Sequence, residues 1–400
     1  MNKNSSQTII EELLERGVED VIDREVLVKK LVAGKPLRIK LGIDPTAADL
    51  HLGHSVVLRK LRQFQDAGHT AVLIIGDFTT LIGDPSGRTT SRPPLTSEQI
   101  RDNMKDYIKQ AAKVIDIDRA EIHYNSEWFS PKPMSFLMDL AGRFTVARLI
   151  EREDFQKRLK DGFDVSMLEL LYPLLQGYDS VAVRADIELG GYDQRLNLLF
   201  GRKVQRAFSQ PEQDVVTVPL LIGTDGEKKM SKSVGNYIKI DEKPEKMFTQ
   251  VMAVPDNLMW NYFELLTDVP AHEIAVLRCE VEAGQTHPRD AKMDLAARIV
   301  FLYWDQNEAK RARQEYVSVT QQDQLPSDIP ATKVADNEVN IVDLIVMIRA
   351  AASKSEARRL VTQGGVKVDN DSKTDWKEVV AVKDGMIVRV GKSRFFKVVK

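Results

Sequence analysis

Cysteine is almost absent from the sequence, since Cys279 is the only one in 400 residues. A single cysteine excludes an internal disulfide, and Cys279 lies in a helical pattern without recognisable partners for a nucleophile, so we expect it to be buried and inert. Long apolar runs are also missing, because no stretch reaches the ~18 residues of a membrane span. The first residues lack the apolar core and cleavage site of a signal peptide. We therefore expect a cytoplasmic protein that does not enter a membrane.

A strong net charge is missing as well. The chain carries 57 Lys and Arg against 59 Asp and Glu, a formal net charge of −2. This balance argues against a protein that binds polyanions over its whole surface. The charge is unevenly distributed, however, because residues 341–400 hold 13 Lys and Arg but only 7 Asp and Glu. A basic C-terminal module on an acidic body remains to be explained.

Apolar runs that fit strands alternate with longer helical patterns through the first half of the chain. This alternation indicates an α/β fold with a Rossmann-like, doubly wound parallel sheet and ligands at the strand-to-helix turns. The runs that fit strands are 37–43, 71–76, 182–189 and 215–221, and the helical patterns between them include 55–67 and 97–114. From about residue 242 to 317 the pattern is helical only.

These changes of pattern predict four segments. A 43% hydrophobic content is sufficient for a substantial core, and the length is that of two or three domains. A polar stretch with two prolines reads as a linker. The predicted segments are a Rossmann-like catalytic domain (1–240), an all-helical domain (241–318), the linker (319–338) and a small α+β domain (339–400).

The first expected strand is followed by G-I-D-P-T-A-A-D-L-H-L-G-H, residues 42–54. His51 and His54 are three residues apart, so both can project from one side of the first turn of a helix. Gly53 would let a phosphate or a planar ring approach the backbone, and a helix N-terminus favours phosphate. Alternatives are half of a metal site, for which no Cys or Glu has a useful spacing, and histidines that only pack and cap the helix.

The loop after the second of these strands, I-G-D-P-S-G-R-T-T-S-R, contains Asp84, Arg88 and Arg92. Asp84 could face the ammonium group of a substrate, and the two guanidinium groups could reach phosphate oxygens, so the three side chains together would suit a ligand that carries both groups. A surface turn with two solvated arginines is the alternative.

The last expected strand leads into G-E-K-K-M-S-K-S-V-G-N, residues 226–236. This lysine-rich segment is either a solvated loop or a flexible clamp for an anion. Only Met230 and Val234 are suited to anchor it in a core, and Gly226 and Gly235 would let it move as a gate.

Two of these motifs together resemble the paired signature of class I aminoacyl-tRNA synthetases. They are H-L-G-H (His51–His54) and K-M-S-K-S (Lys229–Ser233), each at the end of an expected strand and in the expected order. Four further segments make nearly the whole chain similar to bacterial tyrosyl-tRNA synthetases. They are G-I-D-P-T-A, I-G-D-P-S-G, Y-P-L-L-Q-G-Y-D (172–179) and G-G-Y-D-Q-R-L-N (190–197).

The spacing of Tyr172, Gln176 and Asp179 supports this narrower resemblance. These residues fall at i, i+4 and i+7, so one face of one helix presents all three. A polar outer face is the alternative. A buried carboxylate such as that of Asp179 needs a hydrogen-bond donor, which a phenol hydroxyl can supply. A site built to bond this hydroxyl rejects phenylalanine, which lacks it, as is known for tyrosine-specific synthetases.

The resemblance implies a role for each matching residue. Residues implied to bind tyrosine are Gly42, Asp84, Tyr172, Gln176, Asp179 and Gln194, with Asp84, Tyr172 and Gln176 on the ammonium, Asp179 on the phenol and Gln194 near the carboxyl group and phosphate. Residues implied to bind ATP are Asp44, Gly53, Arg88, Arg92, Gly191, Asp193, Ser231 and Ser233, with Asp193 on the ribose. Residues implied to act in catalysis are Thr46 and His51 on the outer phosphates, His54 in the turn beneath the nucleotide, and Lys229 and Lys232 on the developing pyrophosphate charge.

One position departs from the family pattern. Many tyrosine enzymes have a Tyr two residues before the Gly of the G-x-D-P-T segment, where it gives the phenol a second partner, and Lys40 stands there in this chain. The specificity hypothesis therefore rests mainly on Asp179. Lys228 matches no implied role, and we expect Trp128 and Met252 to serve only in packing.

The basic tail, A-A-S-K-S-E-A-R-R-L-V-T-Q-G-G-V-K-V (351–368), is similar to a small RNA-binding module also found in a ribosomal small-subunit protein. Lys354, Arg358 and Arg359 share a helix face that could follow a phosphate backbone, and the Gly pair begins a basic hairpin. A DNA-binding helix-turn-helix and a merely solvated basic face are the alternatives.

The implied reaction activates tyrosine with ATP and transfers it to tRNA(Tyr). The resemblance also implies a homodimer, and Mg2+ that accompanies the ATP without a protein metal site of its own. Rival functions are another adenylyl transferase, a tryptophan-specific synthetase, or a catalytically silent RNA-binding protein. The first two give no reason for Gln176 and Asp179 on one helix face, and the intact lysine loop and histidine pair argue against the third.

Overall fold

The structure, a computed structural model, describes residues 3–86, 95–321, 325–326, 329–391 and 394–400. Two compact units form, one of Met1–Lys243 with Gln250–Asp305 and the other of Pro244–Thr249 with Gln306–Lys400. The four predicted segments stay a prediction. Within the described ranges, none of the helices is both long and apolar enough to cross a bilayer.

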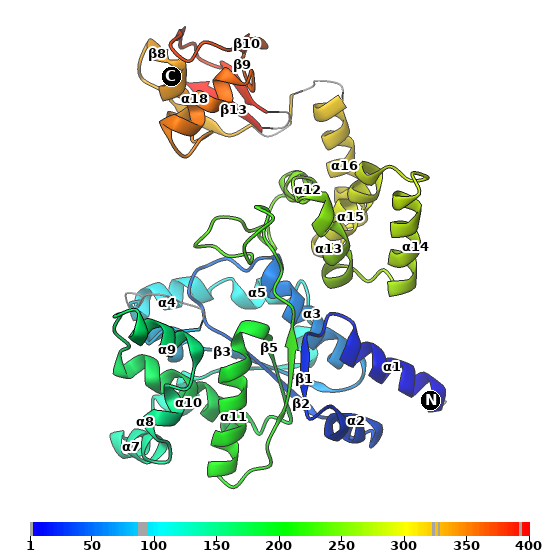
Figure 1. Cartoon of the computed structure of the whole chain (residues 1–400), viewed down its shortest axis with the longest axis vertical. Coiled ribbons are helices and arrows are strands. Elements are labelled where there is room, and N and C mark those ends of the chain that lie inside the picture. Colours follow the sequence, from blue (N-terminus) through cyan, green and yellow to red (C-terminus); the bar gives the residue numbers. More distant parts are fainter. Residues whose placement is uncertain (1–2, 87–94, 322–324, 327–328, 392–393) are drawn as a thin grey trace. The chain divides into compact units, whose positions relative to one another are not determined.

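A six-stranded sheet with the order β1-β6-β5-β2-β3-β4 forms the centre of the first unit (Figure 1). Only the short edge strand β1 is antiparallel to its neighbour, and the other five strands are parallel. The strands are β1 (Asp20–Ile22), β2 (Arg38–Ile43), β3 (Thr70–Ile75), β4 (Ala120–Tyr124), β5 (Ile187–Gly191) and β6 (Asp214–Val218). The predicted Rossmann-like parallel sheet is therefore confirmed.

Helices connect the strands and continue beyond the sheet. The first group comprises α1 (Lys3–Glu15), α2 (Arg24–Val32), α3 (Leu52–Asp66), α4 (Ser97–Met104), α5 (Tyr107–Ala111), α6 (Ser126–Phe129), α7 (Met134–Gly142), α8 (Val146–Leu149), α9 (Glu153–Lys160), α10 (Met167–Val183) and α11 (Arg195–Ala207). After the sheet come α12 (Pro244–Met252), α13 (Met259–Leu266), α14 (Ala271–Glu282), α15 (Pro288–Tyr303) and α16 (Gln306–Gln321).

The strand order places a topological switch point between β2 and β5. From β2 the chain continues through α3 to β3 on one side, and from β5 it continues through α11 to β6 on the other. The turns that leave the carboxyl ends of β2 and β5 therefore separate, and doubly wound sheets bind ligands in this crevice.

Close packing of α10 against α11 fixes the helix that carries three of the predicted site residues. A Cβ on Gly177 would come within 2.7 Å of Val204 Cγ2 and 3.3 Å of the Gly201 backbone. Ser166 and Glu169 form a capping box at the start of α10, which satisfies free backbone groups there. The sequence therefore defines both the beginning of α10 and its contact with α11.

Several local expectations need correction. Residues 182–183 end α10, so β5 begins five residues later than the expected strand, and the helix expected over 97–114 is divided into α4 and α5. Cys279 is exposed, because it lies on a face of α14 that this unit does not cover. Val234 is exposed as well, so Met230 alone anchors the lysine-rich segment in a core.

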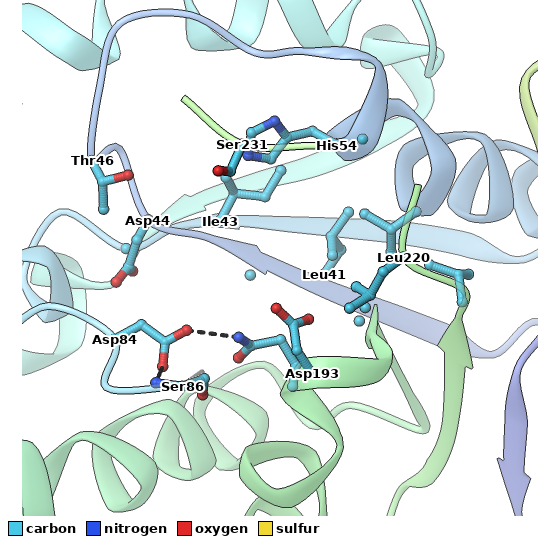
Figure 2. A pocket seen from close by; sticks show the side chains of 18 of the residues that line it. Leu41, Ile43, Asp44, Thr46, His54, Asp84, Ser86, Asp193, Leu220 and Ser231 are labelled. Carbon is cyan, nitrogen blue, oxygen red and sulfur yellow. Dashed lines mark hydrogen bonds between the residues drawn. The ribbon is translucent and has the colours of Figure 1, made fainter. Parts of the chain in front are cut away.

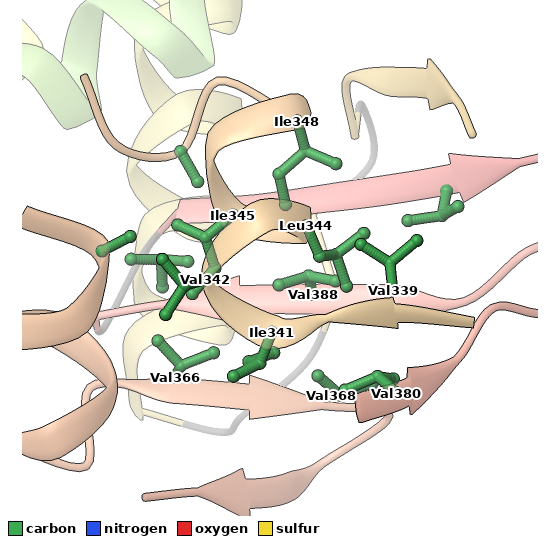
Figure 3. Close-up of a cluster of buried hydrophobic side chains, with 14 of the residues drawn as sticks. Val339, Ile341, Val342, Leu344, Ile345, Ile348, Val366, Val368, Val380 and Val388 are labelled. Carbon is green, nitrogen blue, oxygen red and sulfur yellow. The ribbon is translucent and has the colours of Figure 1, made fainter. Parts of the chain in front are cut away.

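The second unit contains α16 and a small α+β domain. A five-stranded sheet, β10-β9-β12-β13-β7, and a two-stranded pair, β11-β8, accompany α17 (Ile341–Met347) and α18 (Lys354–Thr362). The strands are β7 (Ala331–Lys333), β8 (Glu338–Asn340), β9 (Val366–Val368), β10 (Asp371–Lys373), β11 (Val379–Ala381), β12 (Ile387–Val390) and β13 (Arg394–Val399). Figure 3 shows aliphatic side chains of α17 packed between these strands, with Ile341, Leu344 and Val388 fully buried.

Candidate functional site

A cavity of about 970 Å³ opens at the switch point, beyond the carboxyl ends of β2 and β5. Figure 2 shows Asp44, Asp84 and Asp193 along this cavity, with His54 and Ser231 across it. The structure brings together every predicted catalytic, ATP-binding and tyrosine-binding residue except Arg88 and Arg92, which lie outside the described residues. Those that line the cavity are Gly42, Asp44, Thr46, His51, Gly53, His54, Asp84, Tyr172, Gln176, Asp179, Gly191, Asp193, Gln194, Lys229, Ser231, Lys232 and Ser233.

His51 and His54 form the N-terminal cap of α3. His51 Nδ1 accepts a hydrogen bond from the Gly53 backbone N–H at 3.2 Å, and His54 Nδ1 accepts one from the His51 backbone N–H at 3.2 Å. A Cβ on Gly53 would approach the His51 ring to 3.0 Å, so the glycine makes room for that ring. Both histidines thus cap the helix and line the cavity.

The two histidines are neutral in this arrangement. Burial, followed by the positive charges of Lys232 and Lys229, lowers the pKa of His51 to about 3. Burial and the neighbouring His51 lower the pKa of His54 well below its ordinary value. Because each Nδ1 accepts a hydrogen bond, each proton sits on Nε2, which leaves one donor per ring for a ligand oxygen.

A fixed base holds the lysine-rich segment beside the histidines. The Met230 backbone N–H donates to Leu221 O at 2.7 Å, and Asn236 Oδ1 accepts from the Ser231 backbone N–H at 2.8 Å. The Leu52 backbone N–H donates to Ile238 O at 2.9 Å, which ties the start of α3 to the chain just beyond the segment. Sequence reasoning missed Asn236, although it stands at the end of the quoted motif.

The tips of two lysines reach the cavity from this base. Lys229 Nζ forms an ion pair with Asp193 Oδ2 at 2.7 Å, and Lys232 Nζ donates to Ala47 O at 3.2 Å. Gly226 and Gly235 have positive φ angles of 81° and 79°, which only glycine adopts without strain. The Lys229–Asp193 pair is partly exposed, so little free energy opposes its opening.

Three acidic side chains lie toward the other end of the cavity. Asp44 accepts from Thr79 Oγ1 at 2.9 Å and from the Tyr172 hydroxyl at 3.0 Å. Asp84 accepts from Gln194 Nε2 at 2.7 Å. Among the described residues the Gln176 side-chain oxygen is buried without a hydrogen-bond partner, so this region offers acceptors to a cationic group.

Asp179, the third acidic side chain, is held by two donors from the segment after β4. Trp128 Nε1 donates to Asp179 Oδ1 at 3.0 Å, and Asn125 Nδ2 approaches Asp179 Oδ2 at 3.4 Å. Sequence reasoning missed both residues, and the expectation that Trp128 serves only in packing is wrong. No motif marks them, and β4 itself was not among the expected strands, so the signal was absent at this point of the chain.

Burial raises the pKa of two of these carboxyl groups. It raises the pKa of Asp44 to about 7, with the nearby Asp84 charge acting in the same direction. Burial also raises the pKa of Asp179 to about 7, against the opposing charge of Lys40 and the Trp128 and Asn125 hydrogen bonds. Both groups therefore titrate near neutrality.

The predicted RNA-binding residues lie on α18 in the second unit, and all three are exposed. Lys354 pairs with Asp343 at 2.6 Å, and the Arg358 guanidinium stacks over the Trp376 ring at 4.4 Å. Lys377 lies over the same ring at 5.3 Å. After Gly364 and Gly365 the chain forms the expected hairpin, β9 and β10. A basic surface with one aromatic ring results.

Among the residues that the structure describes, no group of three or more His, Cys, Asp or Glu side chains is placed to hold a metal ion.

Two family descriptions match the chain. Residues 33–321 match tRNA synthetases class I (W and Y), and residues 321–398 match the Tyrosine--tRNA ligase SYY-like C-terminal domain. Among relatives, the Tyrosine--tRNA ligase of Thermotoga maritima is 47% identical over 386 residues, 96% of each chain. That of Burkholderia thailandensis is 50% identical over 388 residues, 96% of this chain and 93% of the relative.

Solved structures show the same fold. A C-terminally truncated mitochondrial tyrosyl-tRNA synthetase of Aspergillus nidulans has a TM-score of 0.67 at 23% identity and covers 77% of this chain and 93% of its own. The tyrosyl-tRNA synthetase of Archaeoglobus fulgidus, complexed with L-tyrosine, has a TM-score of 0.62 at 23% identity and covers 77% and 99%.

The raised pKa of Asp179 predicts a pH-dependent loss of stability. At pH 5 the folded chain keeps this carboxyl protonated while the unfolded chain ionises it, so folding becomes less favourable as the pH rises toward 7. Between pH 5 and pH 8 the free energy of unfolding of the wild type should fall on the order of 2 kcal/mol more than that of Asp179→Asn.

Urea unfolding at the two pH values measures this difference, and the exposed Asp161→Asn variant controls for the loss of any one carboxylate. An equal pH response in wild type and Asp179→Asn would contradict a raised pKa at this position.

Proposed function

Because the chain belongs to the class I tRNA synthetases of the tryptophan and tyrosine group, we propose how its cavity performs the reaction of a tyrosine--tRNA ligase. The enzyme activates tyrosine with ATP to give tyrosyl-adenylate and pyrophosphate. It then transfers the tyrosyl group to the 3′-terminal ribose of tRNA(Tyr). The observation that carries tyrosine specificity is Asp179, a buried acceptor held by Trp128 and Asn125.

The acidic end of the cavity holds tyrosine. Its ammonium lies near Asp84, Tyr172 and the buried, unpartnered oxygen of Gln176, which supply the acceptors that a cation needs. Its phenol donates to Asp179. A phenylalanine ring would leave that buried carboxylate without its donor, and a site of this kind discriminates strongly against such an analogue. Gly42, whose α-carbon faces open space, leaves room for the substrate.

ATP occupies the opposite end. Asp193 accepts from the ribose once Lys229 leaves it, Gly191 permits close approach, and Gln194 lies where the carboxyl group meets the α-phosphate. The neutral His51 and His54 donate from Nε2, and Thr46 contributes beside them. Gly53, Ser231 and Ser233 shape this part of the site, and Asp44 borders it from the acidic end. Arg88 and Arg92 would extend it toward pyrophosphate.

Positioning and charge stabilisation supply the catalysis. The tyrosine carboxylate is already anionic and attacks the α-phosphorus directly, so no side-chain base or covalent nucleophile is required. Charge develops on the departing pyrophosphate, where Lys229 and Lys232 neutralise it. Mg2+ would add charge neutralisation as a companion of the ATP phosphates, because it usually binds through substrate phosphates with few protein ligands.

The second unit binds tRNA through its basic surface. Lys354, Arg358 and Arg359 contact phosphates, and the Arg358–Trp376 stack keeps one guanidinium in place. The exposed apolar side chains of helices α7 to α10, and of the segment between α9 and α10, fit a second copy of the chain, since monomers rarely leave such surface uncovered. They are Met134, Met138, Val146, Leu159, Phe163, Met167 and Leu168. We accordingly propose a homodimer that works in the cytoplasm, where tRNA is charged for translation.

Pyrophosphate exchange into ATP, run with each amino acid in turn, tests the activity. We expect exchange with tyrosine alone, because only its phenol satisfies Asp179. Exchange with tryptophan alone would make the chain a tryptophan enzyme, and exchange with no amino acid would reduce it to a binding protein.

Loss of either lysine that reaches the cavity should slow adenylate formation. Lys229→Ala and Lys232→Ala should each lower its rate constant at least tenfold, with tyrosine affinity changed less than threefold, since the lysines act on charge that develops in the transition state. Stopped-flow fluorescence measures both quantities. Lys228→Ala is the matched control and should resemble wild type; equal losses in rate and tyrosine affinity would remove the lysines from catalysis.

Removal of residues 336–400 should separate the two steps. We expect the truncated chain to form tyrosyl-adenylate at the normal rate but to charge tRNA(Tyr) at least tenfold more slowly, because the basic surface is lost. Single-turnover charging measures the second step. Normal charging would show that this domain does not bind the tRNA productively.

A further inference from the structure

Lys40 is completely buried between β2 and α10. Its side chain has 0% exposure and forms an ion pair with Glu188 Oε1 at 2.7 Å. The two residues are register partners on neighbouring strands β2 and β5, and both side chains point to the face of the sheet that α10 covers. Lysine is rarely buried fully unless it is paired, so this position has an unusual requirement.

Two further oxygens, both on α10, complete the surroundings of the Lys40 ammonium. Lys40 Nζ donates to Gln176 O at 2.9 Å and to Ser180 Oγ at 2.8 Å. Together with the ion pair to Glu188, these hydrogen bonds surround the ammonium group with three oxygens. Lys40 is not among the residues that line the cavity. It therefore cannot bond a phenol in the cavity while it keeps these partners.

The two contacts on α10 bracket Asp179. Gln176 and Ser180 form the helical turn that contains Asp179, and Lys40 attaches both ends of that turn to β2. The same Gln176 presents its unpartnered side-chain oxygen at the ammonium end of the proposed tyrosine site. A small displacement of this turn would move the two polar groups that we assign to opposite ends of the amino acid.

We propose that Lys40, together with Glu188, is a positioning residue for tyrosine specificity. It fixes the Gln176–Ser180 turn on the sheet, so that Asp179 acts as the single charged acceptor for the phenol. The inference rests on the proposed function and deepens it. It assigns to Lys40 a task different from that of the tyrosine expected here from the family pattern, because Lys40 acts through the helix and not on the substrate.

Residues around the ion pair bond to Glu188 and leave space for it. Glu188 Oε2 accepts from Ser180 Oγ at 3.2 Å and also from Gln213 Nε2. A Cβ on Gly201 would lie 2.5 Å from Gln213 Nε2 and 3.0 Å from Glu188 Oε2, so α11 approaches the pair through a glycine. A buried ion pair is often no more stable than an apolar replacement, so stability alone gives little reason for it.

The charge of Lys40 also acts on Asp179 directly. Lys40 lowers the pKa of Asp179 against the effect of burial, the Trp128 and Asn125 hydrogen bonds act in the same direction, and Glu188 opposes them. Asp44 and Tyr172 are the other titratable groups that interact with Asp179 across the cavity. Loss of the Lys40 charge should therefore raise the pKa of Asp179. The acid limb of the pH profile of kcat/KM for tyrosine should then move to higher pH.

The variants are chosen to remove the pair without leaving a buried charge. Lys40→Met alone leaves Glu188 buried without its charge partner and is expected to impair folding. Lys40→Met/Glu188→Leu replaces the pair by apolar side chains and should fold. Lys60→Met is the matched control. Lys60 is a buried lysine of α3 whose Nζ donates to Leu13 O at 3.0 Å and Arg16 O at 2.7 Å, at the end of α1.

Pyrophosphate exchange with tyrosine and with phenylalanine, over a range of pH, is the measurement. In the double variant we expect the ratio of kcat/KM for tyrosine to that for phenylalanine to fall at least tenfold. The loss should lie mainly in KM for tyrosine, and the acid limb should move to higher pH. Lys60→Met should lower the melting temperature and leave the ratio and the limb unchanged.

Glu188→Gln provides an independent test of the role of Lys40 if the double variant does not fold. It keeps an acceptor for Lys40 and Ser180 but removes the charge that opposes Lys40, so the acid limb should move to lower pH. Any of three results would overturn the role of Lys40. The double variant could fold and keep the wild-type ratio of kcat/KM for tyrosine to that for phenylalanine, or the acid limb of the pH profile could stay in place in Glu188→Gln. The third result is an equal fall of the ratio in Lys60→Met. Absence of tyrosine exchange in the wild type would overturn the proposed function itself.

Discussion

The structure depends on keeping carboxylates inside a cavity that shields them from water. Asp44, Asp84 and Asp179 share one end of that cavity. Burial disfavours the charges of Asp44 and Asp179, and repulsion by the other two carboxylates adds to this effect at Asp44. Donors from four parts of the chain offset this cost, including Thr79 after β3 and Trp128 after β4. Because these donors are already in place, the cavity presents ordered acceptors, as the proposed binding of an ammonium group and a phenol requires. In the proposed site, substrate selection is thus a consequence of how the fold stabilises its own buried charge.

The two ends of the cavity are joined by the switch point of the sheet. β2 ends in the segment that leads to His51, and β5 ends in the turn that carries Asp193. The lysine-rich segment crosses between them, with Lys229 resting on Asp193 and its base tied to α3. In the proposed mechanism, lysine side chains on a fixed base stay beside the phosphates while charge moves from the α-phosphate to the leaving group.

Much of this site follows from the sequence, because its residues stand in short motifs at the ends of recognisable strands. Helical spacing alone was enough to place Tyr172, Gln176 and Asp179 together on α10. Trp128 and Asn125 could not be found in this way, since they meet Asp179 only through the pairing of β3 with β4. The exposure of Cys279 also depends on which helix faces the packed unit leaves open. Lys40 could be identified as a departure from the family pattern, but its partner Glu188 is known only from the register of β2 and β5.

The helix cap formed by His51 and His54 has a consequence for the chemistry as a whole. Their pKa values lie so far below neutrality that neither ring changes its protonation over the range in which proteins normally work. In the proposed binding mode, the hydrogen bonds that they offer to phosphate are therefore constant, whereas Asp44 and Asp179 at the opposite end titrate near pH 7. Binding of the nucleotide would thus not depend on pH, and binding of the amino acid would.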